Sequence, residues 1–127
     1  MGESVLRVSP LTVMEDIGPA LSRCRGLGFA VVETEDPGCV GLRAGDSYLI
    51  LATVAPMARQ FRPGTVERLA GRTTPYLHVR SLDRMLARLP ESAVVVERVV
   101  TPFGTVEALV EDGGDRMLLA ERLEDAG

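Results

Sequence analysis

The chain has 127 residues, of which 46% are hydrophobic and 25% are charged, and its formal net charge is −4. This length fits one domain, and this balance is typical of an ordinary globular protein rather than of a disordered segment. The acidic excess, with no basic run, argues against nucleic-acid binding. No apolar stretch approaches the ~20 residues that a membrane-spanning helix needs, so no membrane partner is expected.

The start of the chain, "MGESVLRV", lacks the basic, apolar and small-residue succession of a secretory signal, so we expect a cytoplasmic protein. Cys24 and Cys39 have no metal-type spacing and are expected to be small buried thiols. The chain contains no lysine, which is typical of a GC-rich bacterial genome.

The first elements are a strand and a short helix. Residues 5–13 are β-branched and apolar enough for a strand, although Pro10 fits a central ladder poorly. A helix at 16–25, with Asp16 as its N-cap, is predicted by four apolar residues at spacing i, i+3, i+4 and i+7. These residues are Ile17, Ala20, Leu21 and Cys24.

Three strands follow in the first half of the chain. Residues 29–35 and 39–55 are rich in strand-forming residues, and turn signals at 36–38 and 44–46 divide them into three. Residues 56–73 then interrupt the pattern with two prolines, two glycines and five charges, and we expect a linker there.

The second half repeats this order. A strand at 74–79 precedes a helix at 82–89, whose apolar spacing matches that of the first helix and which Pro90 ends. Three further strands are predicted at 93–100, 104–111 and 116–123, separated by turns at 102–104 and 112–115.

The chain therefore predicts two βαβββ modules, at about 1–55 and 74–127, in a single domain. Such a module cannot close its own sheet, so the two are expected to pair. The predicted fold class is α+β, with a curved eight-stranded mixed sheet and helices on its outer face.

Three segments carry a resemblance to a known family. They are "VMEDIGPALSRCRGLGF", "YLHVRSLDRMLARL" and "TPFGTVEALVEDGGDRMLLAE". In this order and spacing the chain resembles the vicinal oxygen chelate superfamily, the glyoxalase, bleomycin-resistance and extradiol dioxygenase group. The resemblance covers nearly all of the chain, and it implies a homodimer in which βαβββ units pair across chains.

Metal-dependent members of that superfamily hold their metal with His, Glu and Gln on the first and last strands of each module, inside the cup of the sheet. The resemblance places these four positions at Val8, Ile50, Thr74 and Leu118. Three of them are hydrocarbon and cannot coordinate a divalent metal. We therefore expect no metal and no cofactor.

Strand alternation predicts which residues line the cup. If those four positions face the cup, their neighbours face the helices, and all eight are apolar. These are Leu11, Val13, Leu49, Leu51, Leu77, Val79, Met117 and Leu119. The cup side adds Pro10, Thr12, Tyr48, Ala52, Tyr76, His78, Arg116 and Ala120, with Thr105 and Glu107 from the next strand and Phe103 at the rim.

The ligand-binding residues expected from this mapping are Tyr48, Ile50, Thr74, Tyr76, His78, Phe103, Glu107, Arg116 and Leu118. His78 is either a general base or ligand contact, or a histidine bonded to a neighbouring strand or to solvent. Glu107 and Arg116 either form an ion pair across adjacent strands or hold a polar ligand. The aromatic residues either pack in the core and rim or stack on a ligand. No catalytic residue is assigned.

The favoured function is metal-independent binding of an apolar or aromatic small molecule in the cup, and the acidic balance suits a neutral or cationic one. The alternative is a lyase, isomerase or dioxygenase of the same superfamily, with His78 or Glu107 as a base in a metal-free isomerase. A third possibility is a structural or regulatory dimer whose own side chains fill the cup. The sequence does not identify the ligand.

Overall fold

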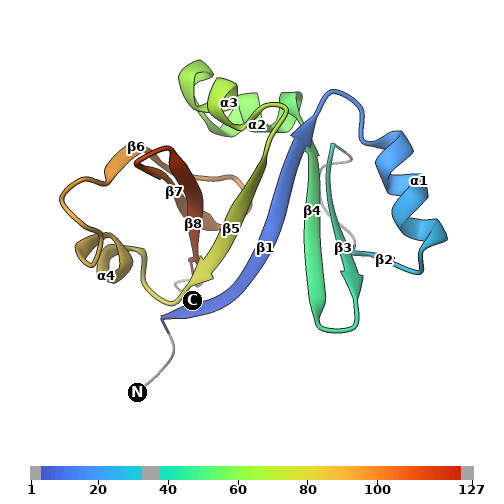
Figure 1. Ribbon diagram of the computed structural model, residues 1–127, viewed down its shortest axis with the longest axis horizontal. Coiled ribbons are helices and arrows are strands. Elements are labelled where there is room, and N and C mark those ends of the chain that lie inside the picture. Colours follow the sequence, from blue (N-terminus) through green and yellow to red (C-terminus); the bar gives the residue numbers. More distant parts are fainter. Residues whose placement is uncertain (1–3, 33–37, 124–127) are drawn as a thin grey trace. The chain divides into compact units, whose positions relative to one another are not determined.

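The computed structural model describes residues 4–32 and 38–123. Its strands form a mixed eight-stranded sheet in the order β2-β3-β4-β1-β5-β8-β7-β6, which confirms the α+β class (Figure 1). The strands are β1 Val5–Met14, β2 Ala30–Val32, β3 Cys39–Ala44, β4 Ser47–Thr53, β5 Thr73–Val79, β6 Val94–Val100, β7 Thr105–Asp112 and β8 Asp115–Arg122. The helices are α1 Gly18–Gly26, α2 Val54–Gln60, α3 Pro63–Leu69 and α4 Leu82–Ala87.

Within the described ranges, every helix is too short to cross a membrane. The chain divides into two compact units. The mid-chain unit is Ser9–Thr74, and the terminal unit combines Met1–Val8 with Pro75–Gly127. Each unit has its own hydrophobic cluster.

In the mid-chain unit, α1 packs on β3 and β4. The cluster there contains Ile17, Val40, Leu42 and Leu51, with Ala20, Leu21 and Cys24 of α1 against it. The helix begins two residues later than the sequence predicted, because Ile17 is the N-cap residue and not Asp16. Asp16 still contributes, since its Oδ1 accepts the Gly18 N–H at 2.9 Å.

The segment expected to be a linker contains two helices, so that expectation is wrong at the level of secondary structure. The prolines and glycines that suggested a linker lie where a helix tolerates them. Pro63, for example, occupies the first turn of α3, where its missing N–H costs nothing. Both helices bury apolar side chains, namely Pro56 and Met57 of α2 and Val66 and Leu69 of α3. The segment after α3 also bonds to β1, because the Gly71 N–H donates to the Val13 carbonyl at 2.8 Å.

The strands and turns predicted for the second half of the chain agree with the structure, whereas part of those predicted for the first half lies outside the described residues. Of residues 29–35, only Ala30–Val32 form a strand among the described residues, and 33–35 lie outside them. Residues 36 and 37 of the predicted turn also lie outside the described part. At the last turn, Gly113 and Gly114 both have positive φ, which a residue without a Cβ adopts freely.

In the terminal unit, α4 packs on one face of β5, β7 and β8. The buried cluster consists of Val79, Leu82, Val106, Ala108, Val110 and Leu119, with Leu77, Met85, Leu86 and Met117 packed against it. These strand residues alternate in sequence, so the intervening side chains point to the opposite face. The apolar alternation predicted for this half of the chain therefore matches the structure.

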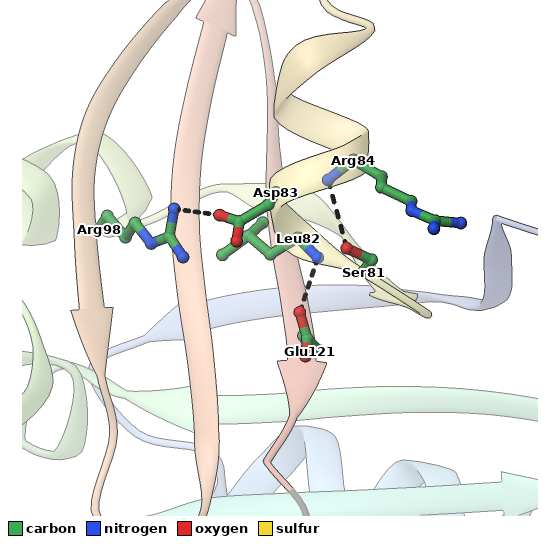
Figure 2. Close-up of polar contacts among 6 residues, drawn as sticks. All are labelled: Ser81, Leu82, Asp83, Arg84, Arg98 and Glu121. Carbon is green, nitrogen blue, oxygen red and sulfur yellow. Dashed lines mark hydrogen bonds and ion pairs between the residues drawn. The ribbon is translucent and has the colours of Figure 1, made fainter.

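Two N–H groups at the start of α4 donate to side chains, one to Ser81 just before the helix and one to Glu121 of β8 (Figure 2). Ser81 is the N-cap, and its Oγ accepts the Arg84 N–H at 3.3 Å. Glu121 of β8 accepts the Leu82 N–H through Oε1 at 2.8 Å. Because Leu82 is fully buried, this bond attaches the start of the helix to the sheet. Asp83 also pairs with Arg98 of β6 at 2.8 Å, but both side chains are well exposed.

We predict that Glu121→Ala lowers the free energy of unfolding by about 1.5 kcal/mol, because it leaves the Leu82 N–H without its charged acceptor. Glu121→Gln keeps an acceptor and is expected to cost less than about 1 kcal/mol. Asp83→Asn, which removes an exposed ion pair, should also cost less than about 1 kcal/mol. Urea unfolding of the three variants tests this order, and equal losses in Glu121→Ala and Asp83→Asn would contradict it.

Candidate functional site

Strand register places a polar group of side chains on the face of the terminal unit that lies away from α4. In the pairing of β7 with β8, Glu107 is opposite Ala120 and Leu109 is opposite Leu118. Ala120 in turn pairs with His78 of β5. Directly paired residues point to the same side of a sheet. The site face is therefore formed by Tyr76, His78, Thr105, Glu107, Leu109, Glu111, Arg116, Leu118, Ala120 and Arg122.

Glu107 is the most deeply buried ionisable group of the site face, with 6% of its surface exposed. The Tyr76 hydroxyl donates to Glu107 Oε2 at 2.7 Å, and the Thr105 hydroxyl donates to the same oxygen at 2.8 Å. Burial raises the pKa of the Glu107 carboxyl, and these two hydrogen bonds oppose part of the rise. The carboxyl can therefore hold or release a proton at a higher pH than an ordinary glutamate.

A second pair of hydroxyls extends this network beyond Glu107. Thr101 Oγ1 and Thr105 Oγ1 lie 2.6 Å apart, and both residues are buried. Thr101 Oγ1 also accepts the Phe103 N–H at 3.3 Å, which fixes the turn between β6 and β7. The network thus connects the turn to Tyr76 through the Glu107 carboxyl.

His78 is a neutral imidazole held by an arginine. Arg7 Nη2 lies 3.0 Å from His78 Nε2, and because a guanidinium only donates, Nε2 accepts and the ring proton lies on Nδ1. Burial, and to a smaller extent the charges of Arg7 and Arg122, together lower the pKa of His78 from 6.5 to about 4. The ring also makes an edge contact with Tyr76, with 5.0 Å between centroids. Bonding to a neighbouring strand was one of the two roles considered for His78, and the structure shows that bond.

The ion pair considered between Glu107 and Arg116 is wrong. Arg116 Nη2 lies 3.0 Å from Glu111 Oε2, and these two residues are directly opposite in the β7–β8 register. Glu107 is opposite Ala120, which lies four residues beyond Arg116 on β8. Its carboxyl accepts hydrogen bonds from hydroxyls instead. Three paired positions of the ladder therefore lie between the two residues that the sequence suggested as partners.

The alternation predicted for the C-terminal half of β1 is also wrong. Thr12 pairs with Leu51, which packs against α1, so Thr12 shares the α1 face. Leu11 pairs with Ile50 and therefore lies on the opposite face, and so does Val13. Leu11 and Val13 are almost fully buried on this opposite face. Both faces of β1 therefore carry buried side chains, so apolar character alone does not show which face packs against α1. The predicted positions of Pro10 and Thr12 on the cup side depended on the same incorrect register.

The remaining expected site residues differ in exposure. In the terminal unit Leu118 is 1% exposed and Phe103 is 42% exposed. In the mid-chain unit Tyr48 and Ile50 are partly buried and Thr74 is 1% exposed. The Thr74 hydroxyl has no hydrogen-bond partner among the described residues.

Tyr48 explains why position 41 is a glycine. A Cβ at Gly41 would lie 2.7 Å from Cζ of Tyr48 and closer still to its hydroxyl. The ring therefore lies directly over β3, and the glycine at position 41 leaves room for it.

Five residues of this arrangement were not expected from the sequence, namely Arg7, Thr101, Leu109, Glu111 and Arg122. Leu109 and Glu111 continue the alternation of Thr105 and Glu107 along β7. Arg122 is two residues beyond Ala120, so extending the alternation of β8 by one step finds it. Thr101 lies just before a predicted turn, where no periodic signal applies. Arg7 has no such signal either, since its place beside His78 depends on how β1 lies in the sheet.

In the part of the chain that the structure describes, the donor set does not fit a divalent metal. Among residues 4–32 and 38–123, no three His, Cys, Asp or Glu side chains lie close enough together to hold one. Of the four positions that the resemblance mapped, Val8 is 57% exposed, and Ile50 and Leu118 are hydrocarbon. Thr74 alone offers an oxygen, and a single hydroxyl is not a metal site.

No family model matches this sequence, and no curated protein matches it. Several solved structures resemble its fold. A glyoxalase/bleomycin resistance protein/dioxygenase superfamily member from Vibrio splendidus is 21% identical, with a TM-score of 0.61 over 91% of this chain and 98% of its own. A hypothetical protein from Bacillus halodurans is 17% identical, with a TM-score of 0.68 over 98% and 99%. The methylmalonyl-CoA epimerase of Mycobacterium tuberculosis is 16% identical, with a TM-score of 0.58 over 95% and 89%. At these identities the likeness shows the fold alone.

We predict that His78 makes the stability of the protein depend on pH. Its pKa is about 4 in the folded chain against 6.5 for an unperturbed histidine, so between these values the unfolded chain binds more protons. The free energy of unfolding should therefore fall as the pH falls from 6.5 to 4. His78→Gln keeps an acceptor for Arg7 and should lack this component. Urea unfolding of both proteins across this range tests the prediction, and parallel pH profiles would contradict it.

Proposed function

We propose, from the premise that this chain has the fold of the glyoxalase/bleomycin-resistance/dioxygenase superfamily, that it is a metal-independent small-molecule-binding protein. The ligand contacts the site face of the terminal unit, and Tyr76, His78 and Glu107 provide its polar contacts. Tyr48, Ile50 and Thr74 belong to the mid-chain unit and remain predictions from the sequence.

The observation that carries this proposal is the burial of the Glu107 carboxyl. Burying a carboxyl costs free energy even when hydroxyls donate to it, and an apolar side chain of similar volume often stabilises a fold as well or better. The packing of α4 does not require it, because the α4 cluster lies on the opposite face of the same strands. A buried carboxyl with a raised pKa, aligned by Tyr76 and Thr105, is typical of a binding or reaction site.

The partly exposed ring of Tyr76 favours a ligand with an apolar or aromatic body. Leu109, Leu118 and Ala120 lie between the polar side chains but are each at most 1% exposed, so they support the site face from below and leave the ligand contacts to their neighbours. The ring of Tyr76 offers an aromatic surface beside them. Ligand pockets commonly combine such a lining with a few polar groups that set orientation.

Metal independence follows in this proposal from the donor set, because three hydrocarbon side chains and one hydroxyl occupy the positions that a metal would need. Elemental analysis of the purified protein is expected to find no stoichiometric zinc, iron, nickel or manganese. One tightly held metal per chain, whose removal abolishes ligand binding, would overturn this part of the proposal.

The binding proposal predicts that a small-molecule library contains compounds that raise the melting temperature, since binding to the folded state alone stabilises it. Tyr76→Asp should abolish that rise while the far-ultraviolet circular dichroism stays unchanged. Leu27→Asp, at a position that is 76% exposed in the other unit, is the matched control and should keep it. Unchanged binding by Tyr76→Asp would show that the site face is not the binding surface.

An enzyme remains the second candidate, as a lyase, isomerase or dioxygenase of the same fold. The raised pKa of Glu107 favours proton transfer in particular, because a general acid or base works best with a pKa near the working pH. Under this alternative, Glu107→Gln keeps ligand binding and loses turnover. Under the binding proposal, no compound that raises the melting temperature is converted by the wild-type protein.

We also propose that the protein is a homodimer. In the terminal unit β6 ends the strand order, and it carries Val94 and Val100 at 59% and 70% exposure. An apolar edge strand of this kind tends to associate unless it is covered, and a second copy covers it symmetrically. Sedimentation at micromolar concentration should give about twice the 13.7 kDa chain mass. A monomer would contradict the proposal.

A further inference from the structure

The imidazole of His78 carries a hydrogen-bond donor on the site face. Its Nε2 accepts from Arg7, with 3.0 Å between the two nitrogens. In a neutral imidazole one nitrogen accepts and the other donates, so the ring proton lies on Nδ1. Among residues 4–32 and 38–123, no acceptor lies within hydrogen-bond distance of Nδ1. The Nδ1–H group is therefore a donor that the described part of the fold does not use.

This donor is open to solvent. Within the described ranges, neither nitrogen of His78 is among the side-chain polar atoms that are both fully buried and unpaired. The side chain as a whole is half-buried. Water satisfies an N–H group of this kind in the free protein, and a ligand that offers an acceptor takes the place of that water.

The ring of His78 is held in one orientation. Arg7 binds one nitrogen, and the two nitrogens of an imidazole point away from each other, so Nδ1–H faces away from Arg7. The edge contact with Tyr76 restricts the ring further. A donor that is oriented before binding loses less conformational entropy when a ligand arrives.

The ring of Tyr76 provides an aromatic surface next to this donor. Tyr76 is on β5 and its hydroxyl bonds to Glu107 on β7, whereas β8 lies between these two strands. The Tyr76 side chain therefore crosses over β8, where Leu118 and Ala120 are at most 1% exposed. Tyr76 itself is partly exposed, so a planar group beside His78 can pack against its ring.

An uncharged acceptor suits this donor better than an ion does. A cation would meet the Nδ1 proton and the charges of Arg7 and Arg122, which already act on the imidazole. The same charges attract an anion, but an anion would exchange its water for an uncharged donor, with the Glu107 carboxyl two strands away. A carbonyl oxygen accepts from Nδ1–H without the desolvation cost of a full charge.

We infer that the small molecule of the site face is uncharged and carries a carbonyl oxygen, such as that of an amide, which accepts from His78 Nδ1–H while an aromatic body packs against Tyr76. This inference rests on the proposed binding function and adds the chemical class of the ligand. It also narrows the expectation from the overall acidic balance, which favoured a neutral or cationic ligand, to a neutral one.

Four compounds with the same aromatic ring test this class, namely benzamide, benzoate, benzylamine and toluene. His78 is the only histidine of the chain, so its imidazole signals in NMR spectra need no assignment. Near neutral pH, benzamide is expected to move the Hε1 and Nδ1 signals of His78 saturably. It should bind about tenfold more tightly than each of the other three, as expected for one well-oriented hydrogen bond without a charge penalty.

Two variants of His78 separate the hydrogen bond from packing. His78→Leu, which has no donor, should weaken benzamide about tenfold and change the binding of toluene much less. His78→Gln keeps an N–H donor and an acceptor for Arg7, so its affinity for benzamide should lie between those of His78→Leu and the wild type. Arg84→Gln is the control, since Arg84 is exposed on α4, on the other face of the strands (Figure 2). It should bind all four compounds as the wild type does.

The outcomes distinguish this inference from the proposed function. If benzoate, benzylamine or toluene moves the His78 signals and binds as tightly as benzamide, the site face binds ligands and the inference is wrong. If His78→Leu weakens benzamide and toluene equally, no specific hydrogen bond exists and the inference is again wrong. If library compounds raise the melting temperature without moving the His78 signals, and Tyr76→Asp does not weaken them, the site face is not the binding surface and the proposed function itself fails.

Discussion

The site depends on the hydrogen bonds that the buried Glu107 carboxyl accepts. Its Oε2 accepts from Tyr76 of β5 and from Thr105 of β7, so one oxygen connects two strands that are separated by β8. Thr105 extends the connection to Thr101 and the turn before β7. Loss of the carboxyl would leave buried hydroxyls without an acceptor, which costs about 1 to 3 kcal/mol for each such group.

The α4 side of the same strands makes this polar arrangement possible. Val106, Ala108 and Val110 of β7 lie in the α4 cluster, and alternation then directs Thr105 and Glu107 to the other face. Stability comes chiefly from the apolar face, since burial of aliphatic side chains is the dominant favourable term in folding. The site face is therefore available for groups that are costly to bury. This division allows one sheet to combine a stable core with a carboxyl of raised pKa and an uncharged imidazole.

Much of this arrangement could be predicted from the sequence, and the failures have physical causes. Periodicity predicts the order of the strands along the chain and both helices that have regular apolar spacing. It also predicts the faces of β5, β7 and β8, because the side chains toward α4 are aliphatic while the other face carries polar side chains. The faces of β1 could not be predicted in this way, because Leu11 and Val13 are buried on the side away from α1. Helices α2 and α3 were missed because the prolines, glycines and charges of residues 56–73 were interpreted as a linker, whereas Pro63 begins a helix. The Arg7–His78 bond depends on pairing between distant segments, which no local pattern contains.

The central claim is that Glu107 is a buried carboxyl held by hydroxyls, and its titration measures this most directly. Carbon-13 NMR of the glutamate side-chain carboxyls, with Glu107→Gln to identify the signal, gives the pKa of this one group. The account predicts a midpoint above the ordinary value of 4.5, and a still higher midpoint in Tyr76→Phe, because that variant loses a bond that lowers the pKa. A midpoint at or below 4.5 in the wild type, or no change in Tyr76→Phe, would contradict it.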